Sequence, residues 1–116
     1  AVLRRAEWGT GQPTDPVEIK VATIRMDFTQ HRVFVKGNEV HLTPTEFDLL
    51  RVLILDAGKV LLHGDLLSEV WGEEYRNDLA ILRVNISRLR QKLEDDPHQP
   101  KYILTISGVG YTFTDE

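Results

Sequence analysis

The fold is decided by residues 77–94, NDLAILRVNISRLRQKLE. Four apolar side chains recur in it at steps of four, three and four positions: Leu82, Ile86, Leu89 and Leu93. This spacing places them on one stripe of an α-helix, and such a stripe is buried when a helix packs in a globular domain. The sequence therefore predicts an amphipathic helix over residues 78–94, with Asn77 or Asp78 as its N-cap.

The opposite face of this helix is polar and cationic. At about 100° per residue, five side chains turn away from the apolar stripe: Arg83, Val84, Ser87, Arg88 and Gln91. Between residues 79 and 94 the cations Arg83, Arg88, Arg90 and Lys92 stand against the carboxylate of Glu94, whereas the whole chain has a formal net charge of −4. An anionic partner would therefore be met by this one surface and not by the molecule as a whole.

Length and composition favour one compact domain. A chain of 116 residues, 41% of them apolar, can bury one core but is too short for two substantial domains. The chain has no cysteine, which fits a reducing compartment and excludes thiolate chemistry. No apolar run reaches the ~20 residues that a membrane span requires. We therefore expect a cytoplasmic protein with no membrane partner.

The first half of the chain predicts a linker, a sheet and a helix. Residues 1–16 end in WGTGQPTDP, which has no hydrophobic period and is typical of a linker. The preceding stretch AVLRR, residues 1–5, is either the end of a helix or a frayed terminus. Residues 17–42 alternate between apolar and polar side chains, which predicts an antiparallel sheet with a hairpin turn at Gly37-Asn38. The stretch TPTE at residues 43–46 has the spacing of a capping box and starts a helix that Gly58 ends.

The second half predicts a short strand, two more helices and a β-hairpin. Residues 60–62 can form the strand, and a second helix is marked by its apolar residues Leu66, Leu67, Val70 and Trp71. Residues 102–106 and 111–114 predict a hairpin around residues 107–110. The expected fold class is α+β: a winged helix-turn-helix with an N-terminal antiparallel sheet, three helices and a C-terminal β-hairpin wing, over residues 17–116.

Four segments resemble, in order and spacing, the DNA-binding effector domain of OmpR/PhoB-type response regulators: HLTPTEFDLLRVL, DLLSEVWG, RVNISRLRQKLE and SGVGYTF. The resemblance spans residues 17–114. Within the family, LRQKLEDDP and a wing without arginine are most similar to the branch that regulates potassium-uptake genes. The resemblance implies that residues 1–16 are the tail of a receiver domain, which lies outside this chain, followed by an interdomain linker. A cognate sensor histidine kinase would act through that receiver domain.

On physical grounds, the outward face of the basic helix suits the major groove of double-stranded DNA, which admits one α-helix. Arg88 can pair with guanine, and Val84 can meet a thymine methyl group. Alternatively, Val84 packs under the wing or the preceding loop. Arg83 can reach a base edge or a phosphate, or else it pairs with Asp78 or Glu94.

The resemblance assigns further DNA-binding roles by position. The two base-reading residues match base-contacting sites of the family, and four residues match sites that hold the phosphate backbone: Trp71, Asn85, Arg90 and Tyr111. Trp71 and Tyr111 also suit an ordinary aromatic core, and the core role and the phosphate contact can hold at once. Ser87 and Gln91 lie on the side of the helix that would face the groove. They either contact bases or only leave room for the DNA.

The sequence departs from the family pattern at three positions. Leu62 replaces the usual serine or threonine N-cap of the second helix and cannot accept a backbone N–H bond. His63 replaces an arginine at a phosphate-contacting site and is mostly neutral at pH 7. Ser107 stands where many members of the family have an arginine that enters the minor groove. The remaining candidates for contact between the wing and DNA are Thr105 and, at the base of the hairpin, Lys101.

The loop before the basic helix matches the family's contact surface for RNA polymerase. Its candidate contacts are Glu73, Glu74, Tyr75 and Arg76, although a plain solvated connection explains the same residues. The family binds direct-repeat DNA as receiver-driven dimers. We therefore expect this domain alone to be monomeric and to bind weakly.

Two other classes of function differ from DNA binding. An enzyme is disfavoured, because the four histidines lie apart without a metal-ligand spacing and no glycine-rich phosphate loop follows a strand; no cofactor is expected. A winged-helix module that binds protein instead of DNA remains the alternative. Steep salt dependence of duplex binding would distinguish the two.

Overall fold

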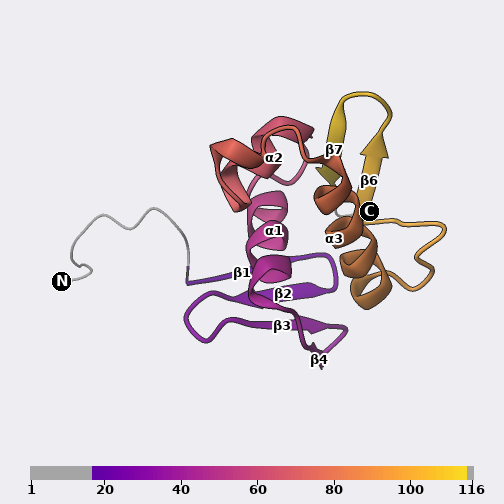
Figure 1. Ribbon diagram of the computed structural model, residues 1–116. Coiled ribbons are helices and arrows are strands. Elements are labelled where there is room, and N and C mark those ends of the chain that lie inside the picture. The colour runs from indigo at the N-terminus through magenta and orange to yellow at the C-terminus, as the bar shows by residue number, and fades with distance from the viewer. Residues whose placement is uncertain (1–16, 115–116) are drawn as a thin grey trace.

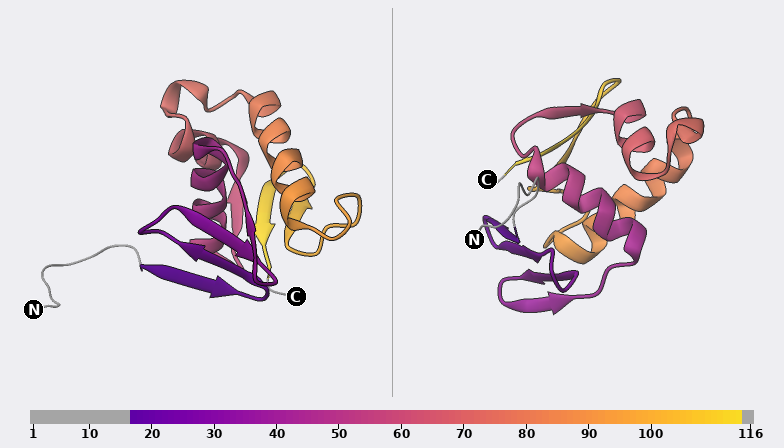
Figure 2. Two further views of the ribbon diagram at one scale, coloured as in Figure 1. Left: turned by 90° about the horizontal axis from the view of Figure 1, so that it is seen from below. Right: turned by 90° about the vertical axis from the view of Figure 1, so that its left-hand side faces the viewer.

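The computed structural model describes residues 17–114, so the expected linker over residues 1–16 lies outside the described residues. In chain order its elements are β1 (Glu18–Val21), β2 (Ile24–Asp27), β3 (Arg32–Val35), β4 (Asn38–Val40), α1 (Pro44–Leu55), β5 (Val60–Leu62), α2 (His63–Val70), η1 (Glu73–Tyr75), α3 (Leu79–Leu93), β6 (Ile103–Ile106) and β7 (Gly110–Phe113). The N-terminal sheet β1-β2-β3-β4 lies at one end of the helices, and the β6–β7 wing rises at the opposite end (Figures 1 and 2). The expected α+β winged helix-turn-helix is confirmed.

The N-terminal sheet is antiparallel throughout, as its alternating pattern predicts. One face buries Ile24, Met26 and Val33 in the core. Just beyond β2, Phe28 meets Phe47 of α1 edge to face, with ring centroids 6.2 Å apart. The sheet therefore supports the start of α1.

The turn between β3 and β4 differs from the expected Gly37-Asn38 pair. Val35 pairs with Asn38, so the two turn residues are Lys36 and Gly37, with φ values of 53° and 84°. Two successive positive φ values are typical of a type I′ hairpin turn. The prediction was wrong by one residue because a lysine, which rarely adopts this conformation, takes the first turn position.

Helix α1 begins with the expected capping box. Thr43 Oγ1 accepts a hydrogen bond from the Glu46 N–H at 3.1 Å, and Glu46 Oε1 accepts one from the Thr43 N–H at 3.0 Å. Five apolar side chains of the helix are buried: Phe47, Leu49, Leu50, Leu53 and Ile54. Since α1 also contacts α2, α3 and β7, it is the centre of the core.

The wing belongs to a three-stranded sheet, because β7 pairs with both β6 and β5. Gly110, which was expected in the wing turn, is instead the first residue of β7. The turn is closed by a 2.9 Å hydrogen bond from the Val109 N–H to Ile106 O. A Cβ atom on Gly110 would lie only 1.8 Å from Leu61 O, so glycine is what allows β5 to approach β7.

Helices α2 and α3 form the helix-turn-helix. The N-cap of α2 is Leu62, which makes no side-chain capping bond, as expected. Of the two candidates for the N-cap of α3, Asp78 has the role, and its Oδ1 accepts a hydrogen bond from the Ile81 N–H at 3.3 Å. The predicted apolar stripe of α3 is confirmed as fully buried. No helix among residues 17–114 is long and apolar enough to cross a membrane.

Candidate nucleic-acid interface

The outward face of α3 is open to solvent along its length. Ala80 and Lys92 of this helix are exposed, and so are all five residues that the helical spacing predicts on this face: Arg83, Val84, Ser87, Arg88 and Gln91. Val84 keeps 46% of its surface exposed, so the alternative in which it packs under the wing or the loop is wrong. An exposed valine on a cationic helix is therefore available for contact with a partner.

Neither carboxylate considered as a partner for Arg83 pairs with it. Asp78 caps α3, and the buried Glu94 carboxylate accepts hydrogen bonds of 2.8 to 3.0 Å from the N–H groups of Lys101, Tyr102 and Ile103. Within residues 17–114, Arg83 and Arg88 make no ion pair or hydrogen bond through their side chains. Both guanidinium groups are available to an anionic partner.

The other two cations of α3 are held within the domain. Arg90 donates two hydrogen bonds to Ile103 O, at 3.1 and 2.9 Å, and one to Thr105 Oγ1 at 2.7 Å. Its guanidinium carbon also lies 5.8 Å from the centre of the Tyr111 ring. Lys92 Nζ lies 2.6 Å from Glu46 Oε1. Arg90 thus fastens α3 to the wing, and Lys92 fastens α3 to the first turn of α1.

Glu46 is the most deeply buried carboxylate of the described residues, with 1% of its surface exposed. Burial by itself would raise its pKa. The hydrogen bonds from Lys92 and from the Thr43 N–H, together with the positive charges of Lys92 and Arg88, outweigh burial and hold the pKa of Glu46 below its ordinary value. The folded state therefore favours the ionised carboxylate.

The lowered pKa of Glu46 predicts a loss of stability in acid. The contribution is present above the ordinary carboxyl pKa and disappears as pH falls through the lowered folded-state value, because protonation removes the pairing with Lys92. At pH 7 we expect Glu46→Gln to have a free energy of unfolding about 1 kcal/mol lower than that of the wild type. This difference should shrink as pH falls. Urea denaturation of both proteins, repeated from pH 7 downwards, measures this difference in the free energy of unfolding. Glu39→Gln, which removes a surface pair with Arg32, is the control, and 0.5 M salt should abolish only the control's effect.

Two of the residues assigned to the phosphate backbone line a shallow groove beside α3. Its walls come from the start of α1, the end of α2 and the outward face of α3: Thr43, Thr45, Trp71, Asp78, Ala80, Ile81, Val84, Asn85 and Arg88. Trp71 is half-buried, and Asn85 is 7% exposed with its Nδ2 donating to Ile81 O at 2.9 Å. This groove brings together residues that sequence reasoning assigned separately.

The wing residues lie at the other side of α3. Tyr111 is 5% exposed and meets the ring of His63 edge to face at 5.5 Å, so it is a core aromatic at the base of the wing. Thr105 is exposed and bonded to Arg90, and Ser107 is exposed in the wing turn. The structure therefore gives Tyr111 and Arg90 a clear packing role in addition to the contacts predicted for them.

The loop before α3 has a defined conformation, with the short helix η1 at its start. Arg76 pairs with Asp65 at 3.3 Å and with Glu73 at 3.5 Å, and Ser68 Oγ donates to Glu73 Oε1 at 2.6 Å. Glu74 and Tyr75 are exposed. The loop thus presents an acidic and aromatic surface on a structured support.

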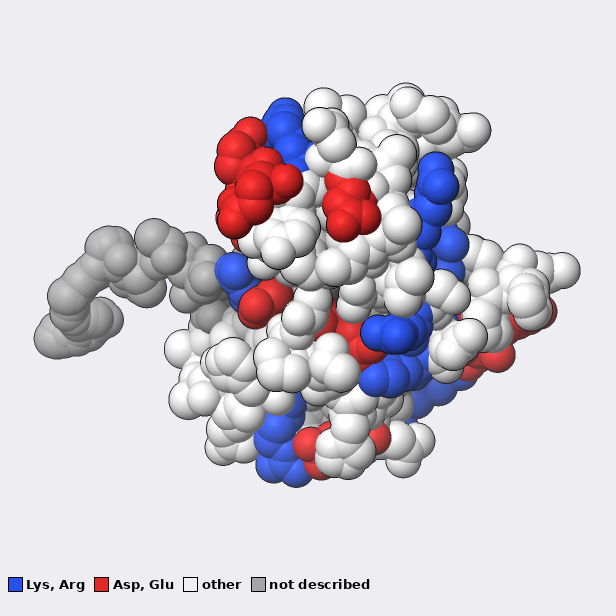
Figure 3. All heavy atoms as spheres, viewed as in Figure 1, with Lys and Arg blue, Asp and Glu red and all other residues white. Residues whose placement is uncertain are grey.

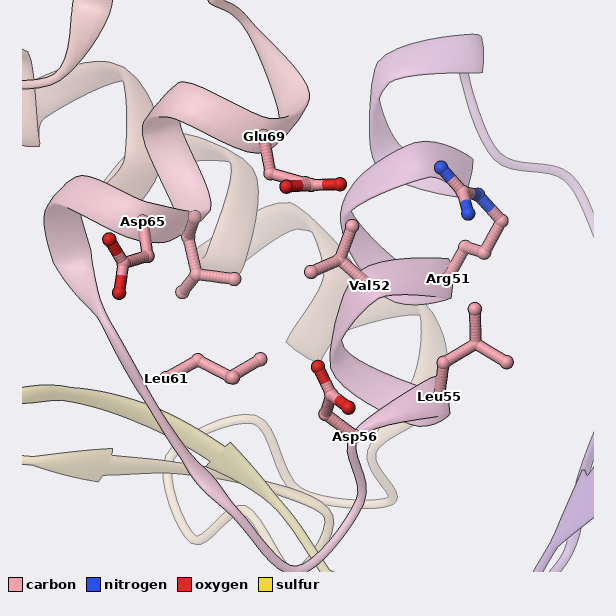
Figure 4. A pocket seen from close by; sticks show the side chains of 8 residues that line it. Arg51, Val52, Leu55, Asp56, Leu61, Asp65 and Glu69 are labelled. Carbon is pink, nitrogen blue, oxygen red and sulfur yellow. The ribbon is translucent and has the colours of Figure 1, made fainter. Parts of the chain in front are cut away.

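Two groups of like charge stand out on the surface. In Figure 3 one group of Lys and Arg side chains lies on the side of the molecule on which α3 lies, and the largest group of Asp and Glu lies over α2 and the turn after it; smaller groups of both signs are scattered over the rest of this face. A cleft of about 490 Å³ between α1 and α2 is lined by apolar side chains, by the carboxylates of Asp56, Asp65 and Glu69 and by Arg51 (Figure 4). With three carboxylates against one guanidinium, this lining is unsuited to a polyanion. Among residues 17–114, no three His, Asp or Glu side chains converge as a metal site.

Comparisons with known proteins agree with this geometry. A family model described as "Transcriptional regulatory protein, C terminal" matches residues 37–113. The transcriptional regulatory protein KdpE of Mycobacterium tuberculosis is 46% identical over 95 residues, which cover 82% of this chain and 42% of KdpE. The chain is therefore similar to a part of that protein and spans less than half of its length.

Solved structures show the same fold. The response regulator DrrB of Thermotoga maritima, described as an OmpR/PhoB homolog, matches with a TM-score of 0.77 and 39% identity over 84% of this chain and 44% of DrrB. The DNA-binding domain of RstA from Klebsiella pneumoniae, solved in complex with the RstA box, matches with a TM-score of 0.79 and 31% identity over 85% of this chain and 98% of that domain.

Proposed function

This chain belongs to the OmpR/PhoB family of transcriptional regulatory domains, and from that membership we propose that α3 binds in the major groove of double-stranded DNA. The domain is a response-regulator effector domain that acts in transcription regulation. The observation that supports the proposed docking is the division of the cations on α3. Within residues 17–114, the side chains of Arg83 and Arg88 make no ion pair or hydrogen bond, whereas Arg90 is bonded to Ile103 and Lys92 is paired with Glu46.

Each group on the open face has a distinct proposed role. Arg88 pairs with a guanine edge, Val84 contacts a thymine methyl group, and Arg83 binds a phosphate or a base edge. Ser87 and Gln91 line the groove beside them. Contacts with bases specify the sequence, whereas contacts with phosphates set the position of the helix on the duplex.

Backbone contacts are proposed on both sides of α3. Trp71 and Asn85 provide them in the groove beside α1, and Tyr111 and Thr105 provide them at the base of the wing. Arg90 supports the second set by holding β6 against α3. The exposed serine at position 107 leaves the wing tip without a cation for the minor groove.

The wider role of the whole protein is also a proposal. The similarity to KdpE supports control of potassium-uptake genes, signalling from a sensor histidine kinase through a receiver domain, and a cytoplasmic location. The loop residues Glu73, Glu74, Tyr75 and Arg76 are proposed to contact RNA polymerase. We propose that the isolated domain is monomeric and that the full protein dimerises on direct-repeat DNA. The alternative function is a winged-helix module for protein binding, and the unpaired arginines of α3 favour DNA over it.

The test is selection of binding sites from a random duplex pool by the wild-type domain and by Arg88→Ala. We expect the variant to lose about 2 kcal/mol, roughly thirtyfold in affinity, on the selected site and to lose base preference at one position. Wild-type affinity should also fall steeply with salt, by a log-log slope near −0.9 for each neutralised phosphate. A wild-type domain that fails to bind duplexes at low salt would support the protein-binding alternative. An unchanged motif in the variant would remove Arg88 from base readout.

A further inference from the structure

The cleft between α1 and α2 takes no part in the proposed docking on DNA. Its apolar lining comes from both helices and from β5: Val52, Leu55, Leu61 and Leu66. Leu66 is buried, but the other three side chains are only half-buried, so part of their apolar surface is open to the cleft. Apolar surface exposed in a cleft of about 490 Å³ is typical of a place where another segment of chain packs.

The polar lining of the cleft carries an excess of negative charge. Asp56, Asp65 and Glu69 stand against the guanidinium of Arg51 (Figure 4). Asp56 and Asp65 each pair with a solvent-exposed cation, at 3.8 and 3.3 Å, and exposed pairs of this kind contribute little. Glu69 is exposed and makes no ion pair or hydrogen bond within residues 17–114. A segment that fits this cleft therefore combines apolar groups with positive charge.

The part of the sequence that precedes the described residues contains a segment of this composition. Residues 1–5, AVLRR, place three apolar residues next to Arg4 and Arg5, and the nearest carboxylate is that of Glu7. Arginine suits an acidic cleft, because its planar guanidinium can pair with a carboxylate through two hydrogen bonds. The segment and the cleft are thus complementary in both charge and apolar character.

The cleft is within reach of residues 1–5. β1 begins on the side of the molecule on which α1 and α2 lie, away from α3 and the wing (Figures 1 and 2). Residues 6–16 separate the segment from Val17 and can span up to about 36 Å, at about 3.3 Å per residue of extended chain. The 12 residues of α1, by comparison, measure about 18 Å along the helix axis. The connection is therefore long enough to lead from β1 to the cleft.

We propose that residues 1–5 of this chain dock in the cleft between α1 and α2, with their apolar side chains on its aliphatic lining and their two arginines beside Asp65 and Glu69. The inference does not depend on the docking of α3 on DNA. Docking of the segment sets the direction from which a preceding domain approaches α2. It leaves the reading surface uncovered, because the cleft shares no residue with the open face of α3.

The test uses the whole chain of 116 residues with a spin label beside the segment. Because the chain has no cysteine, Ala6→Cys provides a single attachment site for a nitroxide. At low salt we expect the nitroxide to broaden the NMR amide signals of residues that line the cleft, such as Leu55 and Glu69. The signals of Ser87 and Gln91, on the open face of α3, should keep their intensity. No DNA is present in the sample, so the result is separate from the docking of α3.

Charge reversal supplies the matched variants. Arg4→Glu combined with Arg5→Glu should lower the ratio of docked to undocked chains about tenfold, because two attractions become two repulsions. The broadening over the cleft should then disappear, and adding Asp65→Arg with Glu69→Arg to the same chain should restore it. Thermal unfolding of the reversed chain verifies that it is folded. Broadening that is missing from the chain with its natural charges, or that survives the first reversal, would overturn the proposal.

A mixed sample identifies the source of the segment. It contains spin-labelled chains without isotope and isotope-labelled chains without the nitroxide, so only contacts between two molecules broaden signals. We expect the signals of the cleft to keep their intensity in this mixture. Broadening of these signals would mean that a second copy of the chain fills the cleft, and it would overturn docking within one chain.

Discussion

Gly110→Ala is expected to lower the free energy of unfolding by about 3 kcal/mol, the upper end of what overpacking costs. The added Cβ would lie 1.8 Å from Leu61 O and 2.8 Å from Leu61 C. Both are backbone atoms of the neighbouring strand and cannot rotate away as a flexible side chain would. The clash is relieved only if β5 moves away from β7, which breaks the ladder between them.

Urea denaturation followed by tryptophan fluorescence measures this loss. Gly108→Asn is the matched control, because Gly108 has a φ of +74° and an added Cβ would meet no atom within 4 Å. Asparagine tolerates this backbone conformation, so the control should lose less than about 1 kcal/mol. If the two variants unfold at the same urea concentration, the close approach of β5 to β7 does not restrict position 110 to glycine.

The second large effect is expected from Arg90→Ala, at about 3 kcal/mol of stability. Its guanidinium provides two hydrogen bonds to the carbonyl of Ile103, a residue with no exposed surface, and one to Thr105. Removal leaves a buried carbonyl without these donors. It also releases the wing from α3, so DNA affinity should fall along with stability.

Arg90→Lys distinguishes this fastening from a direct phosphate contact. Lysine keeps the charge but loses the planar fork that reaches Ile103 O with two nitrogens. We expect the lysine variant to lose most of the stability that alanine loses and to keep the salt slope of DNA binding. If both variants were as stable as the wild type and lysine restored affinity, Arg90 would act on the phosphate alone.

The features that sequence predicts well here depend on neighbouring residues in the chain. The stripe of Leu82, Ile86, Leu89 and Leu93 is buried, and the capping box of α1 forms as expected, because each pattern can be recognised within the sequence of one helix. Turns are predicted less well. Lys36 takes a left-handed position that its side chain does not signal, and Gly110 is needed for contact with a strand about fifty residues earlier.

The same distinction applies to the site. Helical spacing places Arg83, Val84 and Arg88 on the open face, and the structure finds them exposed. Spacing does not reveal that Lys92 is held by Glu46, 46 positions away, or that Arg90 is held by the wing strand. A count of cations on α3 therefore gives twice the number that are available to DNA.

The Glu94 carboxylate, which accepts hydrogen bonds from three consecutive backbone N–H groups at residues 101–103, joins the end of α3 directly to the start of β6. The intervening residues 95–100 are bypassed by this junction. Apart from Asp95, which pairs with Lys36, we expect changes in their length and composition to leave the angle between α3 and the wing unchanged, since closing a somewhat longer loop costs little. We therefore expect this segment to tolerate the insertion of a peptide tag or of a second module.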